Sequence, residues 1–145
     1  MALEIAALGA HDRPAWEALA RGYKAFYRTP TGAAEFDAAW SRLRDARDVH
    51  GLGARLDGRL VGIVHYLFHA STWAPTVCYL QDLFTDPQAR GRGVARALIE
   101  AVAQQARAGG AQRCYWLTQQ DNHTARALYD KVARYNGFIR YDIAL

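Results

Sequence analysis

Two segments in the first third of the chain repeat their apolar residues with the spacing of a helix. In the first, apolar side chains recur at i, i+3, i+4, i+7 and i+11, at Trp16, Leu19, Ala20, Tyr23 and Tyr27. In the second, after a break at residues 29–32, they recur at Phe36, Trp40 and Leu43. This spacing collects apolar side chains on one face, so each segment is predicted to be a helix that packs against a core.

From residue 50 onward the pattern changes to short apolar runs that are typical of strands. Residues 50–56 and 60–69 flank Asp57-Gly58, a pair typical of a two-residue hairpin turn. Residues 60–69 are apolar on both faces, which predicts a central strand. Further strands are predicted at residues 3–8, 76–85, 111–118 and 138–143, with helices at residues 91–108 and after Asp121-Asn122.

The order of these elements, β-α-α-β-β-β-α-β-α-β, predicts one α/β domain over residues 1–145 with a mixed sheet. A chain of 145 residues is long enough to bury a core of its own. No repeat, low-complexity segment or interdomain linker interrupts the pattern.

Composition and charge argue against a nucleic-acid-binding protein and against a metal site. The net charge is +4, but no block of Lys or Arg is longer than two residues, so we expect no nucleic-acid partner. Cys78 and Cys114 lie in strand-like runs and are expected to be buried free thiols. No spacing of His and Cys is typical of a metal site, so no metal is expected.

The start of the chain lacks the pattern of a signal peptide. No apolar run approaches the ~20 residues of a membrane span. We therefore expect a cytoplasmic protein with no membrane partner.

The segment from Arg90 to Arg96 is the strongest functional signal. It follows a predicted strand, opens a helix and contains Gly91 and Gly93. The N-terminus of a helix binds anions, and glycines let a diphosphate approach the backbone closely. Arg96 stands where a dinucleotide-binding GxGxxG motif has its third glycine, and the GK[ST] of a nucleotide P-loop is absent. Coenzyme A remains as the candidate diphosphate ligand.

Two motifs resemble those of a known family. Arg90-x-x-Gly93-x-Ala95, preceded by residues 79–87, resembles the acetyl-CoA signature of the GNAT N-acetyltransferases. The closing helix and strand of that family are similar to Asn122-x-x-Ala125-Arg126-x-Leu128-Tyr129 followed by Asn136-Gly137-Phe138. Residues 64–69 and 114–118 look more particularly like its polyamine/histone acetyltransferase-like subgroup.

The resemblance implies a fold and a cosubstrate. The fold would be a mixed, mostly antiparallel sheet of about six strands, flanked by four helices and splayed at the acetyl-CoA site. The last strand would be shared across a homodimer. The residues implied to contact acetyl-CoA are Leu83, Phe84, Thr85, Arg90, Gly91, Arg92, Gly93, Val94, Ala95, Arg96, Asn122 and Tyr129.

The resemblance also implies a reaction, the transfer of an acetyl group to a primary amine by direct attack on the thioester. The Leu83 N–H would stabilise the thioester oxygen, and Tyr129 would give a proton to the departing thiolate. Relatives often carry a glutamate at the position of Gln81, which cannot ionise. This departure leaves a second function open, a non-catalytic module that binds or senses acyl-CoA.

The general base is also left open. Asp82 is a candidate catalytic residue or an anchor for a cationic amine, and strand alternation predicts that it shares a face with Leu80 and Phe84. His65 is expected to be a buried structural histidine, whereas His69 is a candidate base acting through water.

The acceptor site is expected to be aromatic, because aromatic faces attract ammonium groups. Tyr23, Tyr27, Trp73 and Gln81 are predicted to contact the acceptor. It would be a polyamine or diamine, a lysine-like small molecule or a protein lysine.

Overall fold

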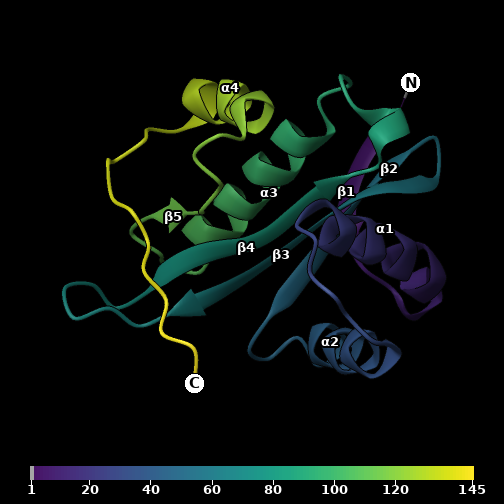
Figure 1. Cartoon of the computed structure of the whole chain (residues 1–145), viewed down its shortest axis with the longest axis horizontal. Coiled ribbons are helices and arrows are strands. Elements are labelled where there is room, and N and C mark those ends of the chain that lie inside the picture. Colours follow the sequence, from purple (N-terminus) through teal and green to yellow (C-terminus); the bar gives the residue numbers. More distant parts are fainter. Residues whose placement is uncertain (1) are drawn as a thin grey trace.

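A computed structural model describes residues 2–145 as one twisted sheet between two layers of helices (Figure 1). The strand order is β1-β2-β3-β4-β5, antiparallel except for the parallel pair β4–β5. The strands are β1 Leu3–Ala7, β2 His50–Leu56, β3 Arg59–His69, β4 Val77–Thr85 and β5 Cys114–Tyr115. The helices are α1 Arg13–Phe26, α2 Ala33–Asp45, α3 Val94–Ala108 and α4 His123–Val132.

The sheet separates two hydrophobic cores. On one face, α1 and α2 pack through Trp16 and Phe36 against the Ile63 side of β3. On the other face, α3 packs through Leu98, with α4 beside it at the edge of the same core. Gly62 of β3 allows this close approach, because an added Cβ would lie 2.7 Å from a methyl carbon of Val94. The α/β fold with four flanking helices is therefore confirmed.

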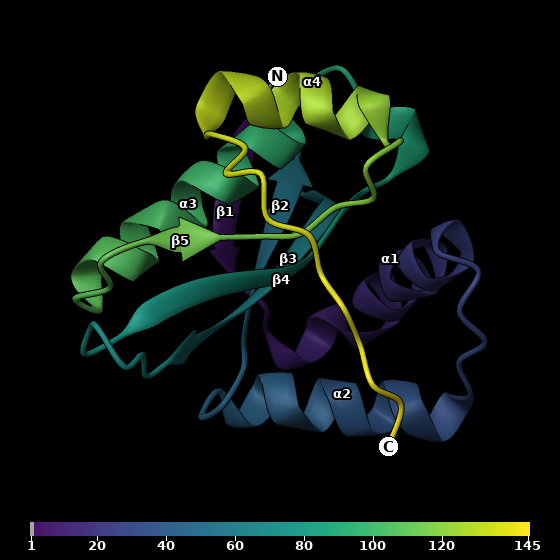
Figure 2. The ribbon, with the colours of Figure 1, turned by 60° about the vertical axis from the view of Figure 1, so that its left-hand side comes forward.

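The sheet has five strands within residues 2–145, one fewer than the predicted number of about six. After β5 no strand is formed in the described residues, and the segment from residue 133 runs as extended chain past β5 (Figure 2). The apolar alternation at Phe138, Ile139 and Tyr141 has no partner strand in the part of the chain that the structure describes, and these residues are 84%, 71% and 87% exposed. Alternation of apolar and polar residues indicates that one face of a segment can be buried, but a strand forms only where a neighbouring strand is available to pair with it. β5 is likewise two residues long rather than the predicted eight.

Two turns show how local sequence sets the boundaries. Asp57 and Gly58 both have positive φ, 50° and 85°, as the predicted hairpin turn requires. α3 begins at Val94 and not at Gly91, because Gly91 and Gly93 adopt left-handed φ values of 77° and 78°. The two glycines therefore belong to the turn before the helix. Within residues 2–145, no helix combines the length and apolar character needed to cross a membrane.

A buried ion pair connects the start of α1 to β2. The Asp12 carboxylate accepts hydrogen bonds from the Gly9 N–H at 2.7 Å and from the Arg55 guanidinium. Burial alone would raise the pKa of Asp12, but the hydrogen bonds from Arg55 and Gly9 outweigh it and lower the pKa. Asp12 is thus ionised in the folded protein, and its charge is compensated by Arg55.

We expect Asp12→Ala to lower the free energy of unfolding at pH 7 by about 3 kcal/mol, because it leaves the largely buried Arg55 charge unpaired. The pKa of Asp12 is lower in the folded than in the unfolded chain, so its contribution is complete above about pH 4 and is lost as pH falls through the folded value. Urea denaturation from pH 7 to pH 2 should show the two proteins converging. The double variant Asp12→Ala/Arg55→Met should recover stability, and a difference that stays constant with pH would contradict this account.

Candidate active site

A β-bulge in β4 determines which groups of that strand meet at the site. In the pairing of β3 with β4, His65 lies opposite Asp82, but its neighbour Tyr66 lies opposite Leu80. Gln81 is therefore an extra residue without a partner of its own. One extra residue reverses the alternation of side chains beyond it.

The bulge corrects the predicted position of Asp82. Leu80 packs in the core beneath α3, whereas Phe84 packs against the core beneath α1. Asp82 contacts His65 and Tyr23 and so lies on the α1 side with Phe84. The expectation that Asp82 shares a face with Leu80 is wrong, because simple alternation does not continue through Gln81.

The same bulge decides where the backbone amides of β4 point. The Cys78 N–H donates toward β5, to the Arg113 carbonyl at 3.0 Å, and the Asp86 N–H donates toward β3, to the Val61 carbonyl at 2.8 Å. Counting back from Asp86 by alternation, the amides of Leu83 and Thr85 face the β5 side of the strand. β5 has already ended at that level.

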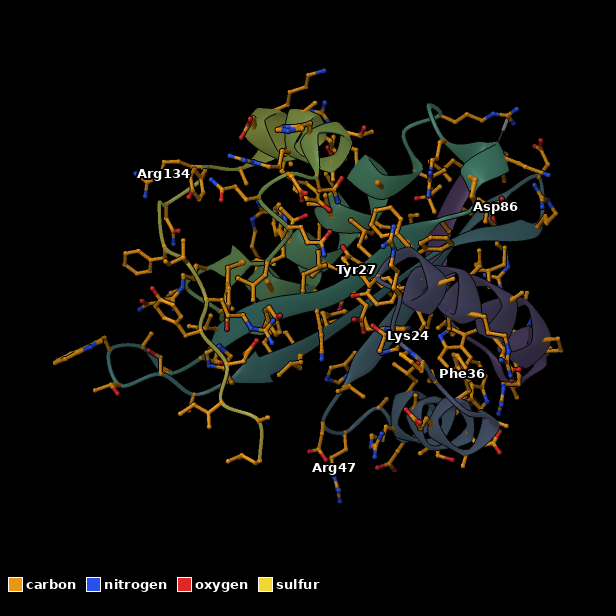
Figure 3. All side chains as sticks on the ribbon, viewed as in Figure 1. Lys24, Tyr27, Phe36, Arg47, Asp86 and Arg134 are labelled. Atoms are coloured by element: carbon orange, nitrogen blue, oxygen red, sulfur yellow. The ribbon has the colours of Figure 1, made fainter. Side chains whose placement is uncertain are left out.

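β4 and β5 diverge beyond their two paired positions, Cys78–Cys114 and Tyr79–Tyr115. A small cavity of about 20 Å³ lies where they separate. Its walls come from α1, β4, the chain after β5 and α4, and Tyr27 lies over the middle of the sheet (Figure 3). The lining residues are Tyr23, Tyr27, Leu80, Gln81, Leu83, Trp116, Leu117 and Tyr129.

This cavity unites most, but not all, of the residues predicted to act on the acceptor. Tyr23, Tyr27 and Gln81 line it. Trp73 is 90% exposed in the loop between β3 and β4 and is not among the lining residues. His69 also lies apart, since its imidazole contacts the Tyr115 hydroxyl at 2.9 Å, where β4 and β5 are still paired.

Tyr129 closes the cavity from α4. Its ring packs edge-on against Trp116, with centroids 5.4 Å apart. Burial, and to a smaller extent Tyr27, raises the pKa of Tyr129 to about 12. The hydroxyl therefore keeps its proton throughout the physiological pH range.

Asp82 is an ionised carboxylate next to this cavity. Its Oδ2 lies 3.0 Å from Nδ1 of His65. Burial raises its pKa, but the hydrogen bond and the electrostatic interaction with His65, followed by the hydrogen bond from Tyr23 and the charge of Lys24, outweigh burial and lower the pKa. Burial, and next the negative charge of Asp82, raises the pKa of Tyr23, so the Tyr23 hydroxyl remains a donor to the carboxylate.

The turn before α3 has the shape of an anion cradle. A Cβ built on Gly91 or Gly93 would meet no atom within 4 Å, so the backbone there is uncovered. Gly93 precedes the first turn of α3, whose amide groups point out of the helix end. Arg90 stacks over Phe84 at 5.9 Å, and Arg96 pairs with Glu100. A diphosphate fits this combination of open backbone and positive charge.

The structure also places three other residues that were predicted to contact acetyl-CoA. The hydroxyl of Thr85 is buried and has no hydrogen-bond partner within the described part of the chain, so a ligand group could satisfy it. The side chain of Val94 is buried in the core, which leaves only its backbone to face a ligand. Asn122 caps α4 as predicted, since its Oδ1 accepts from the Ala125 N–H.

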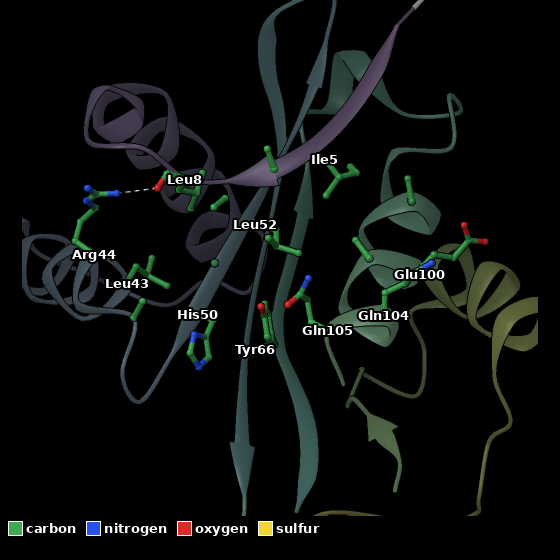
Figure 4. Close-up of a pocket in the computed structure, with 16 residues that line it drawn as sticks. Ile5, Leu8, Leu43, Arg44, His50, Leu52, Tyr66, Glu100, Gln104 and Gln105 are labelled. Carbon is green, nitrogen blue, oxygen red and sulfur yellow. Dashed lines mark hydrogen bonds between the residues drawn. The ribbon is translucent and has the colours of Figure 1, made fainter. Parts of the chain in front are cut away.

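A larger hollow of about 760 Å³ lies elsewhere, at the β1 edge of the sheet between α2 and α3 (Figure 4). Arg44, His50, Tyr66 and Gln105 are among its lining residues. It contains none of the predicted site residues and lacks the open glycine backbone. We therefore place the candidate site at the divergence of β4 and β5.

Comparison with known proteins agrees with this geometry. The family model described as "Acetyltransferase (GNAT) family" matches residues 16–133. The chain belongs to the GNAT acetyltransferase family. It is therefore an N-acetyltransferase that uses acetyl-CoA, which favours an enzyme over a sensing module.

Named relatives of this GNAT protein act on small amines. A D-amino-acid N-acetyltransferase of Saccharomyces cerevisiae is 33% identical over 133 residues, 89% of this chain and 83% of the yeast protein. A thialysine N-epsilon-acetyltransferase of Caenorhabditis elegans is 36% identical over 84 residues, 58% of this chain and 52% of its own length.

Solved structures match the fold. A ribosomal-protein-alanine N-acetyltransferase from Brucella melitensis biovar Abortus 2308 has a TM-score of 0.84 at 25% identity, covering 99% of this chain and all of the other. An aminoglycoside N-acetyltransferase bound to a CoA-containing bisubstrate analogue has a TM-score of 0.89 at 17% identity, covering 100% and 99% of the two chains.

Proposed function

We propose that this GNAT enzyme acetylates a small molecule that carries a primary amine and a second cationic group. The observation that supports this is the Asp82 carboxylate, held beside a cavity walled by Tyr23 and Tyr27. A partly buried negative charge among aromatic rings suits a cationic group. Asp82 would bind the charged group while the other amine reacts.

The named relatives are consistent with a small acceptor, since they act on D-amino acids and thialysine. Gln81 lines the cavity but has no ionisable group. A carboxylate with a lowered pKa, such as Asp82, is a weak base. We therefore propose that the reacting amine loses its proton to solvent, and that Asp82 serves binding.

The roles in acetyl transfer follow from the positions around the divergence of β4 and β5. Bound acetyl-CoA supplies the activated acetyl thioester. The Leu83 N–H would donate to the thioester oxygen, which gains negative charge during attack. Tyr129 would protonate the departing thiolate. Its pKa of about 12 is above that of a free phenol, so the proton must move as the sulfur leaves.

The amides from Gly91 to Arg96 would hold the pyrophosphate, and the Thr85 hydroxyl would gain a partner. A single domain over residues 1–145, a cytoplasmic location and membership of the polyamine/histone acetyltransferase-like subgroup belong to the same proposal.

CoA release with a panel of amines tests the acceptor class. We expect thialysine and 1,4-diaminobutane to be acetylated faster than butylamine, which lacks a second cationic group. Asp82→Asn keeps the shape but removes the charge, so the KM of the better acceptor should rise about tenfold or more while the KM of acetyl-CoA stays within about twofold. Equal rates for diamines and monoamines, or an unchanged acceptor KM, would contradict the proposal.

Tyr129→Phe tests the acid. It removes the proton but keeps the ring against Trp116, so we expect kcat to fall about 10²-fold or more and the Kd of CoA, measured by calorimetry, to change little. Tyr135→Phe, at an exposed tyrosine outside the cavity, is the matched control. A Tyr129→Phe enzyme with wild-type kcat would remove Tyr129 from this role.

We also propose that two copies associate through residues 138–143, whose alternating apolar side chains are exposed and lack a partner strand. Light scattering should give a mass near twice the 16.2 kDa of the chain. Ile139→Lys/Tyr141→Lys should reduce it to one chain. A wild-type monomer at micromolar concentration would refute the dimer.

A further inference from the structure

A chain of hydrogen bonds runs from the interior of the α1 side to the proposed amine anchor. The Trp16 indole N–H donates to Nε2 of His65 at 3.0 Å, and Nδ1 of His65 lies 3.0 Å from Oδ2 of Asp82. Trp16 is fully buried among Phe36 and Trp40. The Trp16 end of this chain of hydrogen bonds is therefore fixed in the core.

This order of partners selects the tautomer of His65. An indole nitrogen can only donate, so Nε2 of His65 must be the acceptor and cannot carry a proton. The proton of the neutral ring then sits on Nδ1, which donates it to Asp82. A hydrogen bond at one ring nitrogen thereby selects the tautomer that the other presents.

The hydrogen bonds from Trp16 through His65 cannot carry a proton away from Asp82. To accept one, His65 would need a free lone pair on Nε2, and Trp16 occupies it. The arrangement therefore orients the carboxylate and does not relay charge. The Tyr23 hydroxyl binds the carboxylate as well, and Lys24 is the cation of α1 whose charge acts on it.

We infer that Trp16 and His65 are positioning residues that keep the Asp82 carboxylate turned to receive the acceptor. This rests on the proposed function, in which Asp82 binds the cationic group of the amine. The bulge at Gln81 places Asp82 opposite His65, and Trp16 then locks the imidazole. Acceptor affinity thus depends on an indole that does not line the cavity.

The tautomer is measurable without any substrate. Imidazole ¹⁵N shifts of the full chain, with His65 identified by its loss in His65→Asn, should show a protonated Nδ1 and a bare Nε2. Trp16→Phe removes the N–H together with part of the indole ring and should reduce the population of that tautomer. Trp40→Phe changes an adjacent aromatic of the same core and should preserve it. A wild-type His65 protonated on Nε2 would overturn the inference.

Kinetics with thialysine separate orientation of Asp82 from simple destabilisation. We expect His65→Leu to raise the KM of thialysine about tenfold, with kcat and the KM of acetyl-CoA staying within about threefold, because Asp82 loses the donor that His65 provides and keeps only Tyr23. His65→Asn can still donate from near the Nδ1 position and should recover most of the affinity. Trp16→Phe should raise the KM more than Trp40→Phe does.

The outcomes distinguish the two proposals. If Asp82→Asn leaves the KM of thialysine unchanged, or thialysine is not acetylated, the proposed anchor fails, and the ¹⁵N shifts still decide the tautomer. If Asp82→Asn raises the KM but His65→Leu and Trp16→Phe do not, Asp82 is the anchor and the positioning role is refuted. Equal effects of Trp16→Phe and Trp40→Phe would also refute it.

Discussion

The site depends on one extra residue in β4. Without the bulge at Gln81, the carboxylate of Asp82 would point into the apolar core beneath α3, where its desolvation would be costly. With the bulge, Asp82 faces His65, and the amides of Leu83 and Thr85 face the side from which β5 diverges. The one bulge thus sets both the position of the side chain proposed to bind the acceptor and the direction of the backbone amides proposed to face acetyl-CoA.

The helices α1, α3 and α4 supply the other groups around the site. α1 contributes two layers, with Trp16 buried behind His65 and with Tyr23 and Tyr27 at the cavity. α4 brings Tyr129 from the opposite side of the divergence, and its start is capped by Asn122. The turn at Gly91 and Gly93 leaves the start of α3 uncovered. Acceptor and cosubstrate groups therefore approach one small cavity from different elements of the fold.

Features that depend on neighbouring residues could be predicted from the sequence. The hairpin at Asp57-Gly58, the helical faces of α1 and α2 and the glycine turn all follow from local preferences or spacing. Features that depend on distant pairing could not. The bulge at Gln81 exists only against β3, and residues 138–143 have strand alternation without a strand to pair with. His65 could be predicted to be buried, but its tautomer depends on Trp16, 49 positions earlier in the chain.

Amide hydrogen exchange of β4, resolved by NMR with and without CoA, tests the central claim most directly. In the free protein, the amides of Leu83 and Thr85 should exchange fast, and those of Asp82 and Phe84, which face β3, should be protected. Binding of CoA should slow the exchange of the Leu83 and Thr85 amides selectively. Protection of Leu83 and Thr85 in the free protein, or slowing by CoA at Asp82 and Phe84 instead, would show that β4 lacks the register on which the account rests.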